Sequence, residues 1–121
     1  MKVAIDISVG EYYDKLTILK IKQNNNIGNT KELDTLVDAN PNEKNKKIVD
    51  SLVEVLLTIN EELWDIEDAK RLCEKNKDFN DEFVQLSRLV YILNDMRAKV
   101  KRQINEFTDS EILEYKSHEG T

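Results

Sequence analysis

Two amphipathic segments on either side of a short polar turn decide the fold. Residues 41–76 read PNEKNKKIVDSLVEVLLTINEELWDIEDAKRLCEKN, and residues 81–107 read DEFVQLSRLVYILNDMRAKVKRQINEF. In both segments apolar residues recur at steps of three and four, which is the spacing of one face of an α-helix. The turn between them is short, and Asn80 can cap the second helix. The sequence therefore predicts a long antiparallel helix hairpin.

Short polar motifs predict where the other elements begin. Ser8 and Glu11 form a capping box at the start of one helix, and Asn40, Pro41 and Glu43 form a second at the start of the hairpin. The predicted elements are a short β-strand or extended arm over residues 1–7, helices over 9–23, 30–38, 41–76 and 81–107, a short helix over 109–115, and a tail over 116–121. The expected class is all-α, a three- to four-helix bundle in which the N-terminal helix packs on the hairpin.

Length and composition narrow the class of protein. A chain of 121 residues is the size of one domain, so residues 1–121 are read as a single unit. The net charge of −6 disfavours nucleic acid as a partner, because an acidic surface repels phosphates. No stretch approaches the ~20 apolar residues that cross a bilayer. The single Cys73 and the absence of a signal-peptide pattern favour a cytoplasmic location.

Polar residues at helical spacing beside the apolar stripes are the candidate binding residues. Three acidic and basic residues lie near the start of the first helix, two pairs belong to two rows on the hairpin helices, and Asp65 directly follows Trp64 of the first row. The candidates are Glu11, Asp14, Lys15, Asn60, Trp64, Asp65, Asn94 and Arg97. An indole surrounded by polar groups suits a ligand or partner site. The alternative is a solvated rim of an ordinary amphipathic bundle.

Sequence signals for catalysis are weak. The chain has no Gly-rich phosphate loop, and its one histidine, His118, cannot form a zinc site by itself. Carboxylates spaced three apart on a helix could hold magnesium through several waters, and Glu11, Asp14, Glu62 and Asp65 are the alternative metal ligands. The leading expectation is a protein without a cofactor.

Several blocks of the sequence resemble a small bacterial and phage family that is known as a domain of unknown function. The blocks are ISVGE at 7–11, DKLTILKIK at 14–22, NEELWDIED at 60–68, DF at 78–79, YILNDMR at 91–97 and EYKS at 114–117. The asparagine run at 24–26 and the low apolar content of the short helix depart from the family pattern. The resemblance implies a compact helical protein, with some relatives linked to cell-surface sugar transfer.

These observations favour a non-enzymatic interaction or assembly module that forms a homodimer or binds another protein. One alternative is a magnesium-dependent, all-α enzyme acting on nucleotides or other phosphorylated metabolites. The other is an accessory domain in sugar transfer, which rests on the family resemblance.

Overall fold

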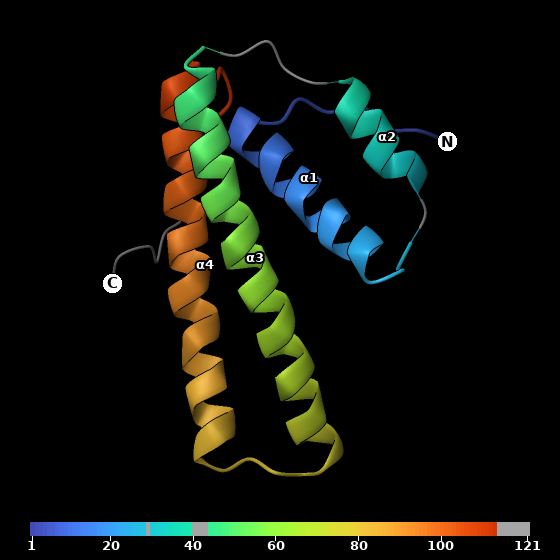
Figure 1. The fold of residues 1–121 in the computed structure, drawn as a ribbon, viewed down its shortest axis with the longest axis vertical. Coiled ribbons are helices and arrows are strands. Elements are labelled where there is room, and N and C mark those ends of the chain that lie inside the picture. Colours follow the sequence, from blue (N-terminus) through green and yellow to red (C-terminus); the bar gives the residue numbers. More distant parts are fainter. Residues whose placement is uncertain (29, 40–43, 114–121) are drawn as a thin grey trace.

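Four α-helices make up the described part of the chain, residues 1–28, 30–39 and 44–113 of a computed structural model (Figure 1). They are α1 (Val9–Asn24), α2 (Thr30–Asp38), α3 (Lys46–Lys75) and α4 (Asp81–Thr108). The predicted all-helical bundle is confirmed. α3 and α4 run antiparallel and pack on each other, α1 packs on both of them, and α2 packs on α1.

Polar caps set the first residues of α1 and α4. The backbone N–H of Glu11 donates to the Ser8 hydroxyl at 3.0 Å, so α1 begins at Val9. The backbone N–H of Glu82 donates to the side-chain oxygen of Asn80 at 3.1 Å. Each cap satisfies an N–H group that has no partner inside its helix.

The start of α3 differs from the prediction, which placed it at residue 41. The helix begins at Lys46, and the preceding Asn45 has a left-handed backbone with φ of 57°. The side-chain amide of Asn45 donates to the backbone carbonyl of Phe107 at 2.9 Å, a contact between the two ends of the hairpin. This left-handed residue interrupts the helix that the sequence pattern extends further back. The predicted cap around Pro41 lies outside the described residues.

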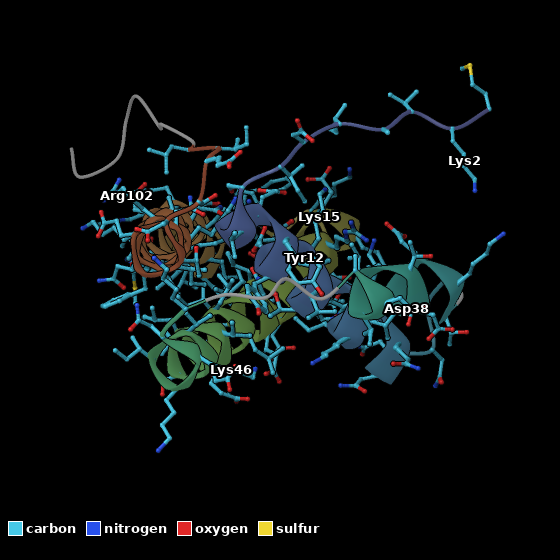
Figure 2. All side chains as sticks on the ribbon, turned by 90° about the horizontal axis from the view of Figure 1, so that it is seen from above. Lys2, Tyr12, Lys15, Asp38, Lys46 and Arg102 are labelled. Atoms are coloured by element: carbon cyan, nitrogen blue, oxygen red, sulfur yellow. The ribbon has the colours of Figure 1, made fainter. Side chains whose placement is uncertain are left out.

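The structure decides between the two alternatives predicted for residues 1–7 and differs from the prediction after α4. The predicted strand is absent among the described residues, and residues 1–7 form the alternative extended arm, which leads away from the helices (Figure 2). Its Val3 and Ile5 side chains are 79% and 76% exposed. The short helix predicted over 109–115 is also absent over 109–113, because Asp109 takes a left-handed backbone with φ of 53° and ends α4. Residues 114–121 lie outside the described part.

The core lies where α1 crosses the hairpin. Apolar side chains from all four helices meet there: Tyr12, Tyr13, Leu16, Leu33, Val49, Leu56, Ile59, Leu93, Val100 and Ile104. The hydroxyl of Tyr12 donates to the backbone carbonyl of Leu36, which attaches α2 to α1. Because charged residues interrupt the apolar faces, none of the described helices combines the length and apolar character that crossing a membrane requires.

Candidate functional site

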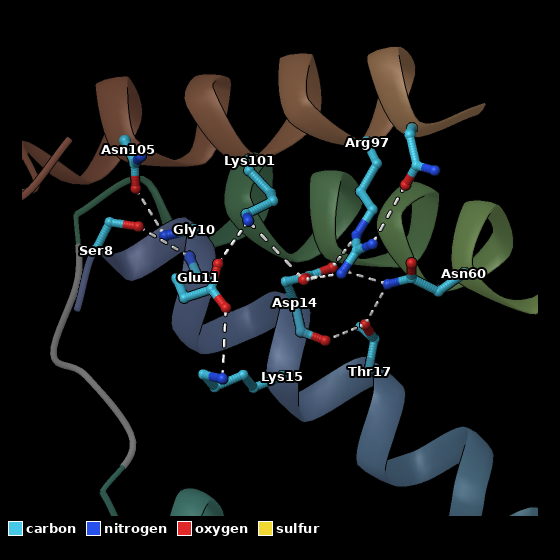
Figure 3. Close-up of polar contacts among 11 residues, drawn as sticks. Ser8, Gly10, Glu11, Asp14, Lys15, Thr17, Asn60, Arg97, Lys101 and Asn105 are labelled. Carbon is cyan, nitrogen blue, oxygen red and sulfur yellow. Dashed lines mark hydrogen bonds and ion pairs between the residues drawn. The ribbon is translucent and has the colours of Figure 1, made fainter. Parts of the chain in front are cut away.

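A buried carboxylate on α1 stands at the centre of the candidate site. Asp14 is 1% exposed, and the Arg97 guanidinium of α4 donates to it through Nε at 2.8 Å and Nη2 at 2.5 Å (Figure 3). The amide of Asn60 on α3 donates to Asp14 at 3.0 Å and to the Thr17 hydroxyl at 2.9 Å. One carboxylate therefore joins α1 to both hairpin helices, and we call these four residues the Asp14 network.

Further polar contacts extend the Asp14 network along α4. Nη1 of Arg97 donates to the Asn94 side-chain oxygen at 3.4 Å. The Lys101 ammonium donates to Glu11 at 2.5 Å and lies 3.9 Å from the Asp14 carboxylate. Glu11 also pairs with Lys15, at 3.5 Å and one turn along α1. The Asp14 and Glu11 carboxylates are thus matched by cations from α1 and α4.

The surroundings of Asp14 keep its side chain ionised. Burial by itself raises a carboxyl pKa, because a low-dielectric interior penalises charge. Hydrogen bonds from Arg97 and Asn60, together with the positive charges of Arg97 and Lys101, outweigh that effect and hold the pKa of Asp14 below its ordinary value. The network therefore carries a permanent ion pair near neutral pH.

The first turn of α1 is seated directly on α4 because Gly10 has no side chain. Its N–H donates to the side-chain oxygen of Asn105 at 2.7 Å. A Cβ at this position would collide with the backbone carbonyl oxygen of Lys101 and lie 2.9 Å from Asn105 Oδ1. The neighbouring Val9 N–H donates to the Ser110 hydroxyl at 3.1 Å. This close approach brings Glu11 and Asp14 within reach of the α4 cations.

A groove of about 360 Å³ opens beside the Asp14 network, between the C-terminal part of α1 and α3. We call it the Trp64 groove. Its polar lining comes from Asn60, Glu67, Asp68 and Arg71 of α3 and Arg97 of α4, and its apolar lining comes from Ile18, Ile21, Ile27, Leu63 and Trp64. The groove has the size of small-molecule pockets, which occupy roughly 300–1,000 Å³.

Six of the eight candidate residues from the sequence lie in one connected set of contacts. These are Glu11, Asp14, Lys15, Asn60, Asn94 and Arg97. Trp64 lines the Trp64 groove, and Asp65 lines a smaller hollow next to it. Gly10 and Asn105 were not among the candidate residues, although Asn105 continues the step of four from Arg97 through Lys101.

The alternative magnesium ligands are not gathered in one place. Among the described residues no three His, Cys, Asp or Glu side chains form a group able to hold a metal ion. Glu11 and Asp14 are engaged by Lys101 and Arg97, and Glu62 is exposed. Burial, with the nearby charges of Glu82 and Asp78, raises the pKa of the Cys73 thiol, so this cysteine stays protonated.

Comparison with known proteins identifies the family. No curated protein matches the chain, and no solved structure does either. A family model described as "Family of unknown function (DUF6165)" matches residues 1–121, which confirms the resemblance to a domain of unknown function. Because the match covers the whole sequence, the chain belongs to DUF6165, a family of unknown function.

Proposed function

We propose that this protein is a non-enzymatic, homodimeric assembly module whose two copies meet through the side of the hairpin that faces away from α1. The observation that carries this proposal is a row of large, half-exposed apolar side chains on that side. We call it the open hairpin face: Ile48 (45% exposed), Val55 (46%), Leu89 (42%), Ile92 (40%), Met96 (46%) and Phe107 (38%).

Helix geometry indicates that these six residues share one side. On α4, the Met96 side chain is rotated by about 100° from that of Arg97, which contacts α1, and the buried Leu93 and Val100 lie between these two directions. On α3, Val55 is five residues from Asn60, a rotation of about 140°. Leu89 and Phe107 repeat the position of Met96 at steps of seven and eleven residues. The two helices therefore present one continuous apolar stripe where α1 does not cover them.

A second copy of the same chain fits the dimensions of the open hairpin face. Helices of 28 and 30 residues are roughly 42–45 Å long, and two lying side by side are about 20 Å wide. That outline is of the order of 900 Å², close to the ~800 Å² per partner of a standard protein interface. Two hairpins packed on these faces complete a four-helix bundle, which buries both stripes at once.

The charges at the edges of the open hairpin face are compatible with a like copy. Exposed Glu62 borders the stripe on α3, and exposed Lys99 borders it on α4. The face therefore carries both signs, even though the whole chain has a net charge of −6. When two copies pack through this face, their charged borders therefore do not consist of like charges alone.

The Asp14 network supports a scaffolding role. Its carboxylate and guanidinium satisfy each other, and we expect this ion pair to hold α1 in one arrangement on the hairpin. The network fixes α1 on one side of the hairpin and so leaves the opposite side for a partner. We expect the module to act in the cytoplasm, in keeping with the single buried Cys73.

Sedimentation equilibrium tests the proposal. The wild type is expected at twice the chain mass of 14.1 kDa, and Met96→Glu is expected to weaken self-association at least tenfold because it buries an unpaired charge. Tyr91→Glu is the matched control, since Tyr91 is 52% exposed on α4 and about 140° away from Met96. A monomeric wild type, or equal loss of association in both variants, contradicts the proposal.

A further inference from the structure

Trp64 separates two hollows of different character on the side of the hairpin next to α1. The larger is the Trp64 groove, with its apolar walls. The smaller, of about 150 Å³, is lined by the carboxylates Glu61, Asp65 and Asp68, and we call it the acidic hollow. Ile21, Trp64 and Asp68 line both, so the two hollows adjoin and one molecule could occupy both.

The acidic hollow carries negative charge without a compensating cation. No Lys or Arg lines it, and none of its three carboxylates forms an ion pair within the described residues. Like charges this close repel one another, and a bound cation relieves the repulsion. The Trp64 indole lines the same hollow and can add to the attraction, because aromatic rings bind ammonium groups.

Asn60, which lines the Trp64 groove, has a side-chain oxygen that accepts no hydrogen bond from the described residues. Asn60 is 5% exposed, and both of its hydrogen bonds use the amide nitrogen, which faces Asp14 and Thr17. Because the Asp14 carboxylate can only accept, the amide must be oriented this way, and its oxygen lies on the other edge. No described residue donates to that oxygen. A buried acceptor left unpaired is costly, so a ligand N–H or O–H placed here would be favoured.

The net charge of the Trp64 groove excludes an anion as the preferred ligand. Glu67 and Asp68 outnumber the exposed Arg71, and the charge of Arg97 is already balanced by Asp14. Because the acidic hollow adjoins the Trp64 groove, the two hollows together carry a net negative charge. The remaining walls are isoleucine, leucine and indole surfaces, which favour an apolar body.

We propose that the Trp64 groove and the acidic hollow together bind a protonated organic amine with an apolar body. The ammonium group lies against the Trp64 indole among Asp65, Asp68 and Glu61. The apolar body runs between Ile21 and Leu63, and a neutral hydroxyl or amide donor at its far end reaches the Asn60 oxygen. This binding site is independent of the open hairpin face, which lies on the other side of the hairpin.

Titration of the full-length protein with three related compounds tests the proposal, using the fluorescence of Trp64, the chain's single tryptophan. Tyramine has the ammonium, the apolar ring and a hydroxyl donor. Phenethylamine lacks the hydroxyl and is expected to bind about fivefold more weakly, the usual effect of one neutral hydrogen bond. The carboxylate analogue of tyramine, which reverses the charge, is expected not to bind at concentrations where tyramine saturates the signal.

Two charge-neutralising variants and a matched control complete the test. Asp68→Asn and Asp65→Asn are each expected to weaken tyramine binding about fivefold, and added salt is expected to weaken it further. Glu62→Gln removes one exposed carboxylate from the same helix but outside both hollows, and is expected to change binding less than twofold. The proposal is overturned if tyramine gives no saturable change, if the carboxylate analogue binds equally well, or if Glu62→Gln weakens binding as much as Asp68→Asn.

Discussion

Replacing Asp14 by asparagine is the perturbation that tests the Asp14 network most sharply. The variant keeps the volume but removes the charge that the Arg97 guanidinium faces at 2.5 and 2.8 Å. Breaking a fully buried pair from one side costs about 3–5 kcal/mol, because it strands the other charge. The Arg97 side chain is 28% exposed and retains solvent contact, so we expect a loss of about 2–3 kcal/mol in the free energy of unfolding.

Urea unfolding followed by circular dichroism measures this loss, with all proteins at one concentration so that association contributes equally. Asp50→Asn is the control, because Asp50 pairs with Lys46 at 3.2 Å on the exposed surface, where such pairs contribute under ~1 kcal/mol. The double variant Asp14→Leu with Arg97→Met removes both charges and is expected to cost less than the two single changes added together. If Asp14→Asn loses no more stability than Asp50→Asn, the reasoning about the network is refuted.

Three further predictions concern the first turn of α1, acid stability and the core. Gly10→Ala is expected to lower the free energy of unfolding by about 1–3 kcal/mol, because the new Cβ meets the Lys101 carbonyl; an unchanged melting temperature would contradict this. Because the folded pKa of Asp14 is lowered, the stability it contributes is present at neutral pH. That contribution is lost as the pH falls from the ordinary carboxyl value of about 3.9 through the folded value. Urea unfolding at several pH values should therefore show that the difference in free energy of unfolding between the wild type and Asp14→Asn shrinks in acid. A difference that stays constant with pH would contradict this prediction. Leu56→Ala, at a fully buried position, is expected to cost about 2–5 kcal/mol, whereas Leu72→Ala, 58% exposed, should change stability by less than ~0.5 kcal/mol in the same assay.

Local sequence signals indicate most of the helical architecture, because caps and apolar spacing act within a few residues. Ser8 and Asn80 show this, since each accepts a backbone N–H of the helix that follows it. The start of α3 was not predictable in the same way. It depends on the bond from Asn45 to Phe107, residues 62 apart in the chain, and on a left-handed backbone that no local pattern indicates.

The candidate site was likewise predictable where it depends on local spacing and not predictable where it depends on the packing of distant helices. Helical spacing placed Asn60 and Arg97 in rows beside the core, and these two side chains do meet at the Asp14 carboxylate. Spacing does not reveal which polar residues become buried, so Asp14 as the central carboxylate emerges only from the packing of α1 on the hairpin. The role of Gly10 was also not predictable from the sequence. The backbone that packs against Gly10 belongs to α4, about ninety residues further along the chain.

The proposed dimer is tested most directly by contacts between two differently labelled copies. Met96 is one of two methionines in the chain, and the other is Met1, so its labelled methyl group reports on the open hairpin face. In an equimolar mixture of copies labelled at methionine methyls and copies labelled at isoleucine and valine methyls, nuclear Overhauser effects should connect Met96 of one copy with Val55 or Ile92 of the other. Intermolecular effects that are absent, or that involve only residues on the α1 side of the hairpin, would contradict the proposed assembly.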